Sequence, residues 1–255
     1  MDWSNQVVLI TGASSGIGRG LAAELARRGA SIGLLARRRE LLDEIVREIT
    51  RSGGRAVALA ADVRHPDEVR SVTSELRKQF GHIDVLIANA GVTAVTDAAQ
   101  LDPEQFADVL NVNLMGAVNS VAAVLPEMLQ RGSGHLVAIS SLAAYRGHRK
   151  AAAYSASKSA LSTFFESVRL DLIGTGIDVS IIHPGFIKTP LTAKRKSRLP
   201  FIMEVDRAVG KIIHAIEKRK KSFAFPWQLA MYVHTGMIMP NFLYDLVARR
   251  ESFKE

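Results

Sequence analysis

Short apolar runs alternate with longer segments of helical periodicity along most of the chain. The short runs, rich in aliphatic residues, predict seven strands at 7–11, 31–36, 56–61, 83–87, 135–140, 177–182 and 222–225. Apolar residues at helical spacing predict helices at 17–28, 39–51, 66–80, 103–129, 151–173 and 204–220. Pro103 is typical of a first helical turn, and Pro126 predicts a kink near the end of the same helix.

This alternation predicts the fold class. Strands joined by helices form a parallel sheet with helices on both faces. No internal repeat, low-complexity tract or linker interrupts the pattern. We therefore expect one α/β domain over residues 1–225. Residues 226–255 form a C-terminal extension that we expect to pack on the same domain or at a subunit interface.

Composition narrows the functional classes. The 255 residues are 47% hydrophobic and 23% charged, which is typical of a globular domain and excludes a disordered or fibrous chain. The absence of cysteine excludes disulfides, thiolate metal sites and cysteine nucleophiles, and we predict no metal. The net charge of +8 is compatible with anionic partners. We expect neither a secretory signal nor a spanning helix, because the first residues lack a basic and apolar leader and no run of 18 apolar residues occurs.

A glycine-rich turn directly follows the first strand. The sequence Thr11-Gly12-Ala13-Ser14-Ser15-Gly16-Ile17-Gly18 ends a strand and opens a helix, which is the context of a dinucleotide-binding turn. Gly12 permits the tight turn, Gly16 lets the backbone approach a pyrophosphate, and Gly18 lets helix and strand pack closely. The helix N-terminus offers free N–H groups to phosphate. The predicted cofactor contacts here are Gly12, Ser14, Ser15, Gly16, Ile17 and Gly18.

The spacing Gly-x-x-x-Gly-x-Gly resembles that of the short-chain dehydrogenase/reductase family. The resemblance covers about residues 5–225 and rests on Thr11–Gly18, Asp62-Val63, Asn89-Ala90-Gly91, Asn113, Ser141, Tyr154-x-x-x-Lys158, and Pro184-Gly185 with Thr189. It implies a Rossmann-like doubly wound sheet of about seven strands, in the order 3-2-1-4-5-6-7. It also implies a homodimer or homotetramer that pairs through the helices at 102–129 and 151–173.

The end of the second strand indicates the cofactor. NAD-binding turns carry an acidic residue there for the ribose 2′-hydroxyl, whereas an arginine suits a 2′-phosphate. This chain has Ala36 at the acidic position, followed by Arg37 and Arg38. We predict NADP(H), with Arg37 as the main phosphate contact and Arg38 as a helper or as an adenine stacking partner. Ser15 departs from some NADP-preferring relatives, which carry a basic residue before the middle glycine.

The resemblance places further cofactor contacts at later strand ends. Asp62 would accept a hydrogen bond from the adenine amino group, with Val63 offering backbone contacts. From the sequence alone, Asp62 is equally suited to cap the helix that begins at Pro66. The small residues Asn89, Ala90 and Gly91 would let the backbone approach the cofactor.

After the sixth strand, Pro184 and Gly185 lead into two more implied contacts. Ile187 would hold the nicotinamide carboxamide through its backbone, and Thr189 would lie near the carboxamide or pyrophosphate. Together these residues would fix the face of the ring that donates hydride.

Four residues form the candidate catalytic set. Tyr154 and Lys158 share one helix face, and a neighbouring cation favours the phenolate of a tyrosine that otherwise titrates near pH ~10. Ser141, at a strand end, can donate to a substrate oxygen. The resemblance places Asn113, rather than Asn111, at a helix distortion where a water links Lys158 to solvent, in a proton relay that passes through Lys158 and the cofactor ribose to Tyr154. It also makes Tyr154 and Lys158 cofactor contacts, with Lys158 orienting the ribose.

The candidate substrate region is basic. Two loops border the expected active-site mouth and contain Tyr145, Arg146, His148, Arg149, Lys150, Lys194, Arg195, Lys196 and Arg198. They predict either an anionic group on the substrate or a solvated lid. The extension is apolar between basic flanks, which favours a pocket cap or subunit interface, with peripheral contact to an anionic membrane as the alternative.

The prediction is an NADP(H)-dependent carbonyl reductase/alcohol dehydrogenase acting on a small molecule, in the cytoplasm. The alternative within enzymes is a 3-oxoacyl carrier-protein reductase, although Thr175 stands where that branch carries a basic residue. The alternative of another class is a catalytically silent NADP sensor or scaffold. The complete set of Asn113, Ser141, Tyr154 and Lys158 argues against the latter, and no nucleic-acid motif occurs.

Overall fold

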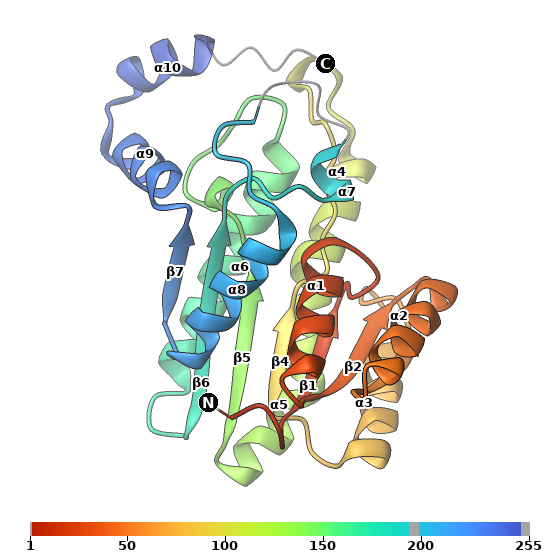
Figure 1. The fold of residues 1–255 in the computed structure, drawn as a ribbon. Helices are drawn as coiled ribbons and strands as arrows, with labels where there is room; N and C mark the ends of the chain where they lie inside the picture. The colour runs from red at the N-terminus through yellow and green to blue at the C-terminus, as the bar shows by residue number, and fades with distance from the viewer. Residues whose placement is uncertain (1, 194–198, 251–255) are drawn as a thin grey trace.

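The computed structural model describes residues 2–193 and 199–250, and this part of the chain contains one seven-stranded parallel sheet (Figure 1). Its order is β3-β2-β1-β4-β5-β6-β7, as predicted. The strands are β1 (Val7–Thr11), β2 (Ser31–Ala36), β3 (Arg55–Ala60), β4 (Val85–Ala88), β5 (Gly134–Ile139), β6 (Ile177–Pro184) and β7 (Ser222–Phe225). Because every neighbouring pair is parallel, the carboxyl ends of all strands meet at one edge.

Helices cover both faces, as strands buried on both sides require. One face carries α1 (Gly16–Arg27), α2 (Arg39–Arg51) and α8 (Val205–Glu217), in front in Figure 1. The other carries α3 (Pro66–Phe80), α5 (Gly116–Arg131) and α6 (Ala152–Asp171). Strand β1 divides its side chains between them, with Val8 and Ile10 in one apolar cluster and Leu9 in the other.

The long helix predicted at 103–129 is three segments. It starts as α4 (Pro103–Leu110), continues as a π-helical segment (Asn111–Met115) and resumes as α5, which runs through Pro126. Within the described residues, Pro103–Arg131 is one helix long and apolar enough to cross a membrane, by length and composition only. Val121 and Met128 are buried in the core of the domain, which is typical of a core helix.

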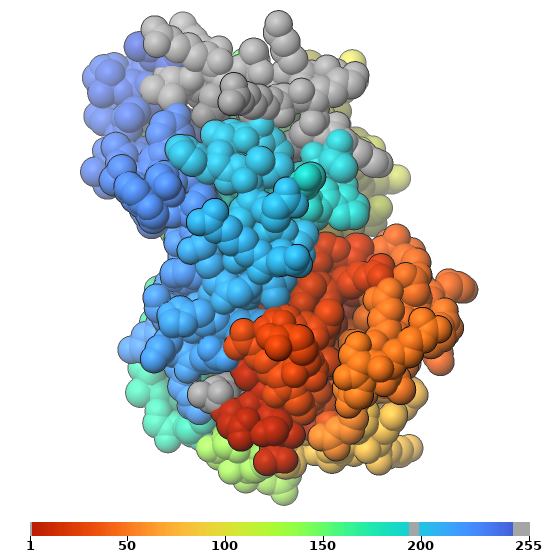
Figure 2. Space-filling view, viewed as in Figure 1, coloured from red at the N-terminus to blue at the C-terminus, as the bar shows by residue number. Residues whose placement is uncertain are grey.

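The C-terminal extension forms α9 (Trp227–Ile238) and α10 (Asn241–Arg250) after β7. Helix α9 buries Leu229, Ala230 and Val233 against Leu142. Its opposite side is exposed, and Ile238 leaves 85% of its surface accessible. In Figure 2 the extension, in dark blue, stands at the upper left, away from the red and orange residues around β1 and β2.

Candidate active site

The glycine turn after β1 is held by close backbone packing. Gly12 and Gly16 have φ values of 66° and 56°, a region that favours glycine. A Cβ on Gly18 would lie 2.4 Å from the carbonyl oxygen of Gly12. A Cβ on Gly12 would lie 2.7 Å from the Cα of Ala90. The backbone itself therefore lines the turn, as the sequence predicted.

Asn89 and Thr11 lock this turn to β4. The Asn89 amide nitrogen donates to the carbonyl oxygens of Thr11 (2.9 Å) and Gly12 (3.2 Å). The Thr11 hydroxyl accepts from the backbone N–H groups of Asn89 and Ala90, both at 3.0 Å. Asn89 thus stabilises the turn through its side chain, and the small side chain of Ala90 leaves room for the close approach of Gly12.

The first turn of α1 is free to meet an anion. Ser15 is its N-cap residue but makes no side-chain capping bond, and the first turn has no acidic residue. Free N–H groups at a helix N-terminus bind phosphate. Arg38 reaches the same turn, since its guanidinium donates to the Ser14 hydroxyl at 2.8 Å. These groups fit the pyrophosphate of a dinucleotide.

Arg37 lies apart from that turn. Its side chain is 62% exposed, and its guanidinium is 3.9 Å from the Asp62 carboxylate. Asp62 also accepts from the Arg64 guanidinium at 2.8 Å. Burial alone would raise the pKa of Asp62, but the hydrogen bonds from Arg64 outweigh it and the pKa is lowered. The N-cap of α3 is His65, so the alternative role of Asp62 as that helix's cap was wrong.

Val63, the other predicted residue after β3, is buried against the helix that carries Asn113. A Cβ on Gly116 would lie 2.5 Å from a methyl carbon of Val63. The Val63 carbonyl accepts from the Asn119 side chain at 2.9 Å. The end of β3 is therefore fixed against α5.

Lys158 is a buried cation at the centre of the site. Its ammonium donates to the Ile139 carbonyl at 2.9 Å, at the end of β5. Its Nζ lies 6.0 Å from the centre of the Tyr154 ring, one turn earlier on α6. Burial lowers the pKa of Lys158 to about 8. The predicted Tyr–Lys pair is therefore present on one face of α6.

Asn113 occupies the π-helical segment and joins three parts of the site. Its Oδ1 accepts from the Val92 N–H at 2.7 Å, and its Nδ2 donates to the Val92 carbonyl at 3.0 Å. Nδ2 also donates to the Ser157 hydroxyl at 2.9 Å. A Cβ on Gly91 would lie 3.4 Å from both Asn113 Oδ1 and Lys158 Nζ. Asn113 and Lys158 thus flank the end of β4, whereas Asn111 is exposed.

Ser141 and Ser140 differ in what they bind. Ser140 is buried and bonded to the Lys158 carbonyl and the Ser162 hydroxyl. Ser141 is half-buried at the start of the 3₁₀ turn Leu142–Ala144 (η3), where its hydroxyl accepts from the Ala143 N–H at 3.1 Å. A hydroxyl in that bond can still donate its own proton. Ser141 is therefore the serine available to a substrate oxygen.

The chain after β6 returns to the glycine turn. Gly185 N–H donates to the Phe225 carbonyl at 2.7 Å, which holds the end of β6 against β7. Ile187 is buried and forms a bridge with Met203. A Cβ on Gly16 would lie 3.2 Å from the Thr189 methyl carbon. Thr189 therefore packs over the middle glycine of the turn.

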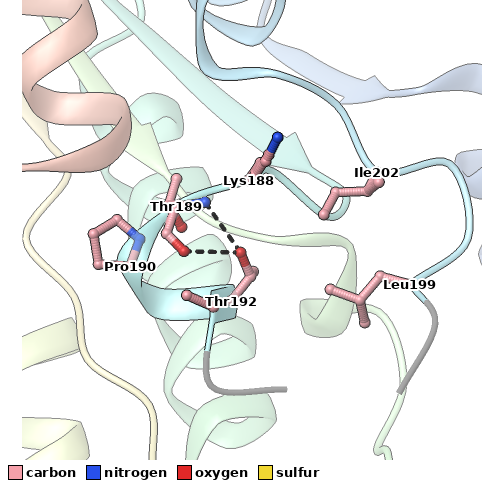
Figure 3. A pocket seen from close by; sticks show the side chains of 7 residues that line it. Lys188, Thr189, Pro190, Thr192, Leu199 and Ile202 are labelled. Carbon is pink, nitrogen blue, oxygen red and sulfur yellow. Dashed lines mark hydrogen bonds between the residues drawn. The ribbon is translucent and has the colours of Figure 1, made fainter. Parts of the chain in front are cut away.

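A hollow of ≈390 Å³ opens beside this segment, which includes the short helix α7 (Pro190–Ala193) (Figure 3). Thr192 fixes its wall, because its hydroxyl accepts from the Thr189 N–H at 3.1 Å and donates to the Ile187 carbonyl at 2.6 Å. Leu199 and Ile202 line the hollow across from Thr189 and Pro190. Its lining is therefore mostly apolar.

The basic mouth is weaker than its composition indicates. Arg146 donates to carbonyl oxygens of the extension, and the Lys150 ammonium lies 3.6 Å from Asp97. The other predicted cations Lys194, Arg195, Lys196 and Arg198 lie outside the described residues. Arg149, the third described arginine or lysine of these loops, is exposed. Because Arg146 and Lys150 contact other parts of the protein, the hypothesis of an anionic substrate group loses these two cations.

Two contributing residues were missed from the sequence. Ser157 accepts from Asn113 and donates to the Tyr154 carbonyl at 2.8 Å, so it connects the π-helical segment to the Tyr–Lys helix. Its place between Tyr154 and Lys158 was the available signal. Arg146 was considered only as a substrate cation, and no sequence signal pairs it with the extension.

A doubly wound sheet with a glycine turn and a Tyr–Lys pair at its carboxyl edge defines a dinucleotide-binding oxidoreductase. The family model of short chain dehydrogenase matches residues 6–200. The chain therefore belongs to the short-chain dehydrogenase/reductase family, as its motifs predicted, and it is an NAD(P)-binding oxidoreductase.

Similar proteins agree with this assignment. An "Uncharacterized oxidoreductase" of Myxococcus xanthus is 42% identical over 249 residues, 98% of each chain. "11-beta-hydroxysteroid dehydrogenase 1A" of Arabidopsis thaliana is 42% identical over 190 residues, which are 73% of this chain and 54% of that protein. The solved structure of levodione reductase is 22% identical, with a TM-score of 0.81 over 89% of this chain and 98% of that one, and it shows the shared fold.

Proposed function

We propose that the protein is an NADP(H)-dependent carbonyl reductase/alcohol dehydrogenase. The observation that carries the proposal is the fully buried ammonium of Lys158 on the same helix face as Tyr154. Burying a cation costs free energy, and a buried cation is therefore a candidate for function. Close to Tyr154, its charge favours the phenolate and brings the tyrosine into the range of acid–base chemistry.

The chain's residues divide the reaction between them. A bound nicotinamide supplies or accepts the hydride. Tyr154 gives the proton to the carbonyl oxygen in reduction and removes it in oxidation, while the Ser141 hydroxyl donates a hydrogen bond to that oxygen. Lys158 supplies a positive charge near the Tyr154 phenol. Asn113, held at the helix distortion, supports a relay that returns the proton from solvent through Lys158 to Tyr154.

NADP(H) is the proposed cofactor. Ala36 ends β2 without a carboxylate, and Arg37 and Arg38 follow it directly. The Arg38 contact with Ser14 supports this preference, because it brings a guanidinium to the turn that fits the cofactor phosphates.

An uncharged, lipophilic carbonyl compound is the proposed substrate class. The apolar cluster in which Leu229, Ala230 and Val233 of α9 pack on Leu142, the residue after Ser141, supports this choice. The name of the Arabidopsis relative, a hydroxysteroid dehydrogenase, points in the same direction. A 3-oxoacyl carrier-protein reductase remains second, since Arg146 and Lys150 are already paired within the protein.

Assembly and location stay predictions. We propose a homodimer or homotetramer in the cytoplasm, with the exposed side of α9 and α10 available to a subunit interface or to peripheral membrane contact. Exposed Leu170 and Ile173 on and after α6 support pairing through that helix.

The test is NADPH oxidation with a panel of ketones, from small aryl ketones to steroids and acyl thioesters, for the wild type and Tyr154→Phe. Loss of the phenol proton should reduce kcat about 10²–10⁴-fold, with NADPH binding unchanged. Fluorescence titration of NADPH provides the control. No turnover of any substrate by a wild type that binds NADPH would contradict the reductase proposal and favour the sensor alternative.

A further inference from the structure

Arg146 connects the loop of the candidate catalytic serine to the C-terminal extension. It lies five residues after Ser141, in the segment between η3 and α6. Its guanidinium donates to the carbonyl oxygens of Gly236 and Met239, the latter at 3.0 Å, and to the Asn241 side chain at 2.9 Å. One half-buried side chain therefore contacts the end of α9, the joint and the start of α10.

Tyr244 of α10 completes the contact from the other side. The Arg146 guanidinium lies 3.7 Å from the centre of the Tyr244 ring, a cation–π distance. The Tyr244 hydroxyl donates to the Gly147 carbonyl at 2.8 Å. The two residues thus bind each other's segments.

An arginine suits this place for a physical reason. The last carbonyl oxygens of a helix have no partner within it, and its C-terminus carries partial negative charge. Residues 227–244 contain no Asp, Glu, Lys or Arg. The charge that satisfies the end of α9 therefore comes from the loop that follows Ser141. A lysine would bring the charge without the planar fork that reaches two carbonyls and stacks on a ring.

The docked helix α9 lies beside the candidate catalytic centre. Its buried side packs on Leu142, the residue after Ser141, with Tyr145 and Phe186 against the same cluster. The Tyr145 ring centre lies 4.7 Å from the ring centres of both His183 and His234. His183 in turn approaches the Ser141 carbonyl at 3.4 Å. The position of α9 is therefore coupled to the segment that presents Ser141.

We propose that Arg146 is a positioning residue that fixes α9 and the start of α10, residues 227–244, as a wall without acidic, lysine or arginine side chains beside Ser141, so that the site favours large uncharged carbonyl substrates. The inference rests on the proposed reductase function. Arg146 itself is assigned no contact with substrate or cofactor. Its effect on the reaction is exerted through the position of α9.

The first experiment compares Arg146→Met with the wild type on two ketones, one large and apolar and one small. The KM for the large ketone should rise about tenfold, because the wall is no longer fixed. The kcat for the small ketone and the dissociation constant of NADPH should stay within twofold. Arg70→Met is the matched control, since Arg70 pairs with Asp67 on the exposed side of α3. It should change none of these values.

Two further variants guard against a folding defect. Tyr244→Phe keeps the ring under the guanidinium and removes the hydroxyl that donates to Gly147, so its KM effect should have the same direction and be smaller. Arg146→Lys should rescue part of the loss. A KM for the large ketone that stays at the wild-type value in both Arg146→Met and Tyr244→Phe would overturn the proposal. An equal loss on both ketones would also overturn it, because it would show a general structural role.

Limited proteolysis measures how firmly the extension is held on the domain and does not depend on enzyme activity. Chymotrypsin cleaves after aromatic residues, and Trp227, Tyr232 and Phe242 are exposed on the extension. Cleavage within residues 227–246 should be several times faster in Arg146→Met than in Arg70→Met. If the wild type reduces no ketone, the proposed function fails, and this rate then decides the positioning role alone. Equal cleavage of the two variants would overturn it.

Discussion

The glycine turn and the C-terminal extension are held in opposite ways. The turn is defined by close contacts of its backbone: a Cβ on Gly18 would meet the Gly12 carbonyl oxygen at 2.4 Å and the Asn89 side-chain nitrogen at 2.6 Å. The extension is held by a small apolar cluster and by the contacts of Arg146, while Trp227 and Ile238 remain largely exposed. In Figure 2 the extension, in dark blue, stands apart from the red N-terminal part of the chain, to which the glycine turn belongs.

This difference teaches where each region tolerates change. Close backbone packing permits no added atom, because neither partner can rotate away. An exposed helix that is anchored at a few points accepts most surface changes and responds to loss of an anchor. We therefore expect changes in the first region to act on cofactor binding and catalysis, and changes in the second to act on substrate choice.

The largest expected effect is at Lys158, the buried cation of the first region. Lys158→Met should reduce kcat about 10²–10⁴-fold, because Tyr154 loses the neighbouring positive charge. The same change should raise the stability of the protein without cofactor. Burial lowers the pKa of Lys158 from 10.5 to about 8, so the buried charge costs about 3 kcal/mol of folding stability at neutral pH. The variant loses the bond to Ile139, worth about 1 kcal/mol, and should therefore gain the remainder.

The sign of the pH dependence follows from that pKa. Below pH 8 the folded protein carries the buried charge, so the stability advantage of Lys158→Met is fully present. As the pH rises from about 8 toward 10.5, Lys158 loses its proton in the folded state first, and the advantage disappears. Urea unfolding of the wild type and the variant at pH 7 and pH 10 measures the difference in stability between them, with Lys78→Met, at an exposed lysine of α3, as control. A stability difference that is equal at both pH values would contradict the assigned burial cost.

The next comparison adds one methyl group to each region. In Gly18→Ala the new Cβ would meet the Gly12 carbonyl oxygen at 2.4 Å. We therefore expect the free energy of unfolding to fall by about 1–3 kcal/mol and NADPH binding to weaken more than tenfold. In Gly236→Ala the new Cβ lies 3.8 Å from Tyr244, an ordinary contact, and the helix should gain about 0.5–1 kcal/mol. Urea unfolding and NADPH titration measure both variants. A tolerated Gly18→Ala would contradict the contrast between the regions.

The sequence predicted what depends on local pattern. The seven strands and the glycine turn follow from apolar periodicity and from glycines in a fixed context, so Gly12, Gly16 and Gly18 lie where expected. The order of the strands was implied by the family resemblance and is confirmed. The Tyr154–Lys158 pair follows from helical spacing in the same way.

The remainder depends on contacts distant in sequence. Residues 103–131 have continuous helical periodicity, so that pattern did not show the π-helical segment, and the distortion at Asn113 was expected from the resemblance alone. The bonds from Asn113 to Val92 and Ser157 accompany it. Arg146 was interpreted as a substrate cation because nothing near it in the sequence indicated its partners, which lie 90 to 98 residues later. Long charged side chains reach several partners, and no local pattern selects one.

The last comparison, with an expected effect smaller than that of Gly18→Ala on NADPH binding, separates Arg37 from Arg38. The sequence assigns the 2′-phosphate mainly to Arg37, but Arg38 is the one bonded to Ser14 in the turn, whereas Arg37 faces Asp62. We expect Arg37→Ala and Arg38→Ala each to raise the KM for NADPH about tenfold, equivalent to about 1.4 kcal/mol, and to leave the KM for NADH unchanged. Arg39→Ala is the control, because Arg39 pairs with Asp43 on the exposed side of α2. A rise for Arg38→Ala alone would make Arg38 the main phosphate contact. Equal changes in the KM for NADPH and for NADH in both variants would contradict NADP(H) preference. They would also show that the family's spacing, which fixes the positions of Gly12, Gly16 and Gly18, does not fix the roles of these long side chains.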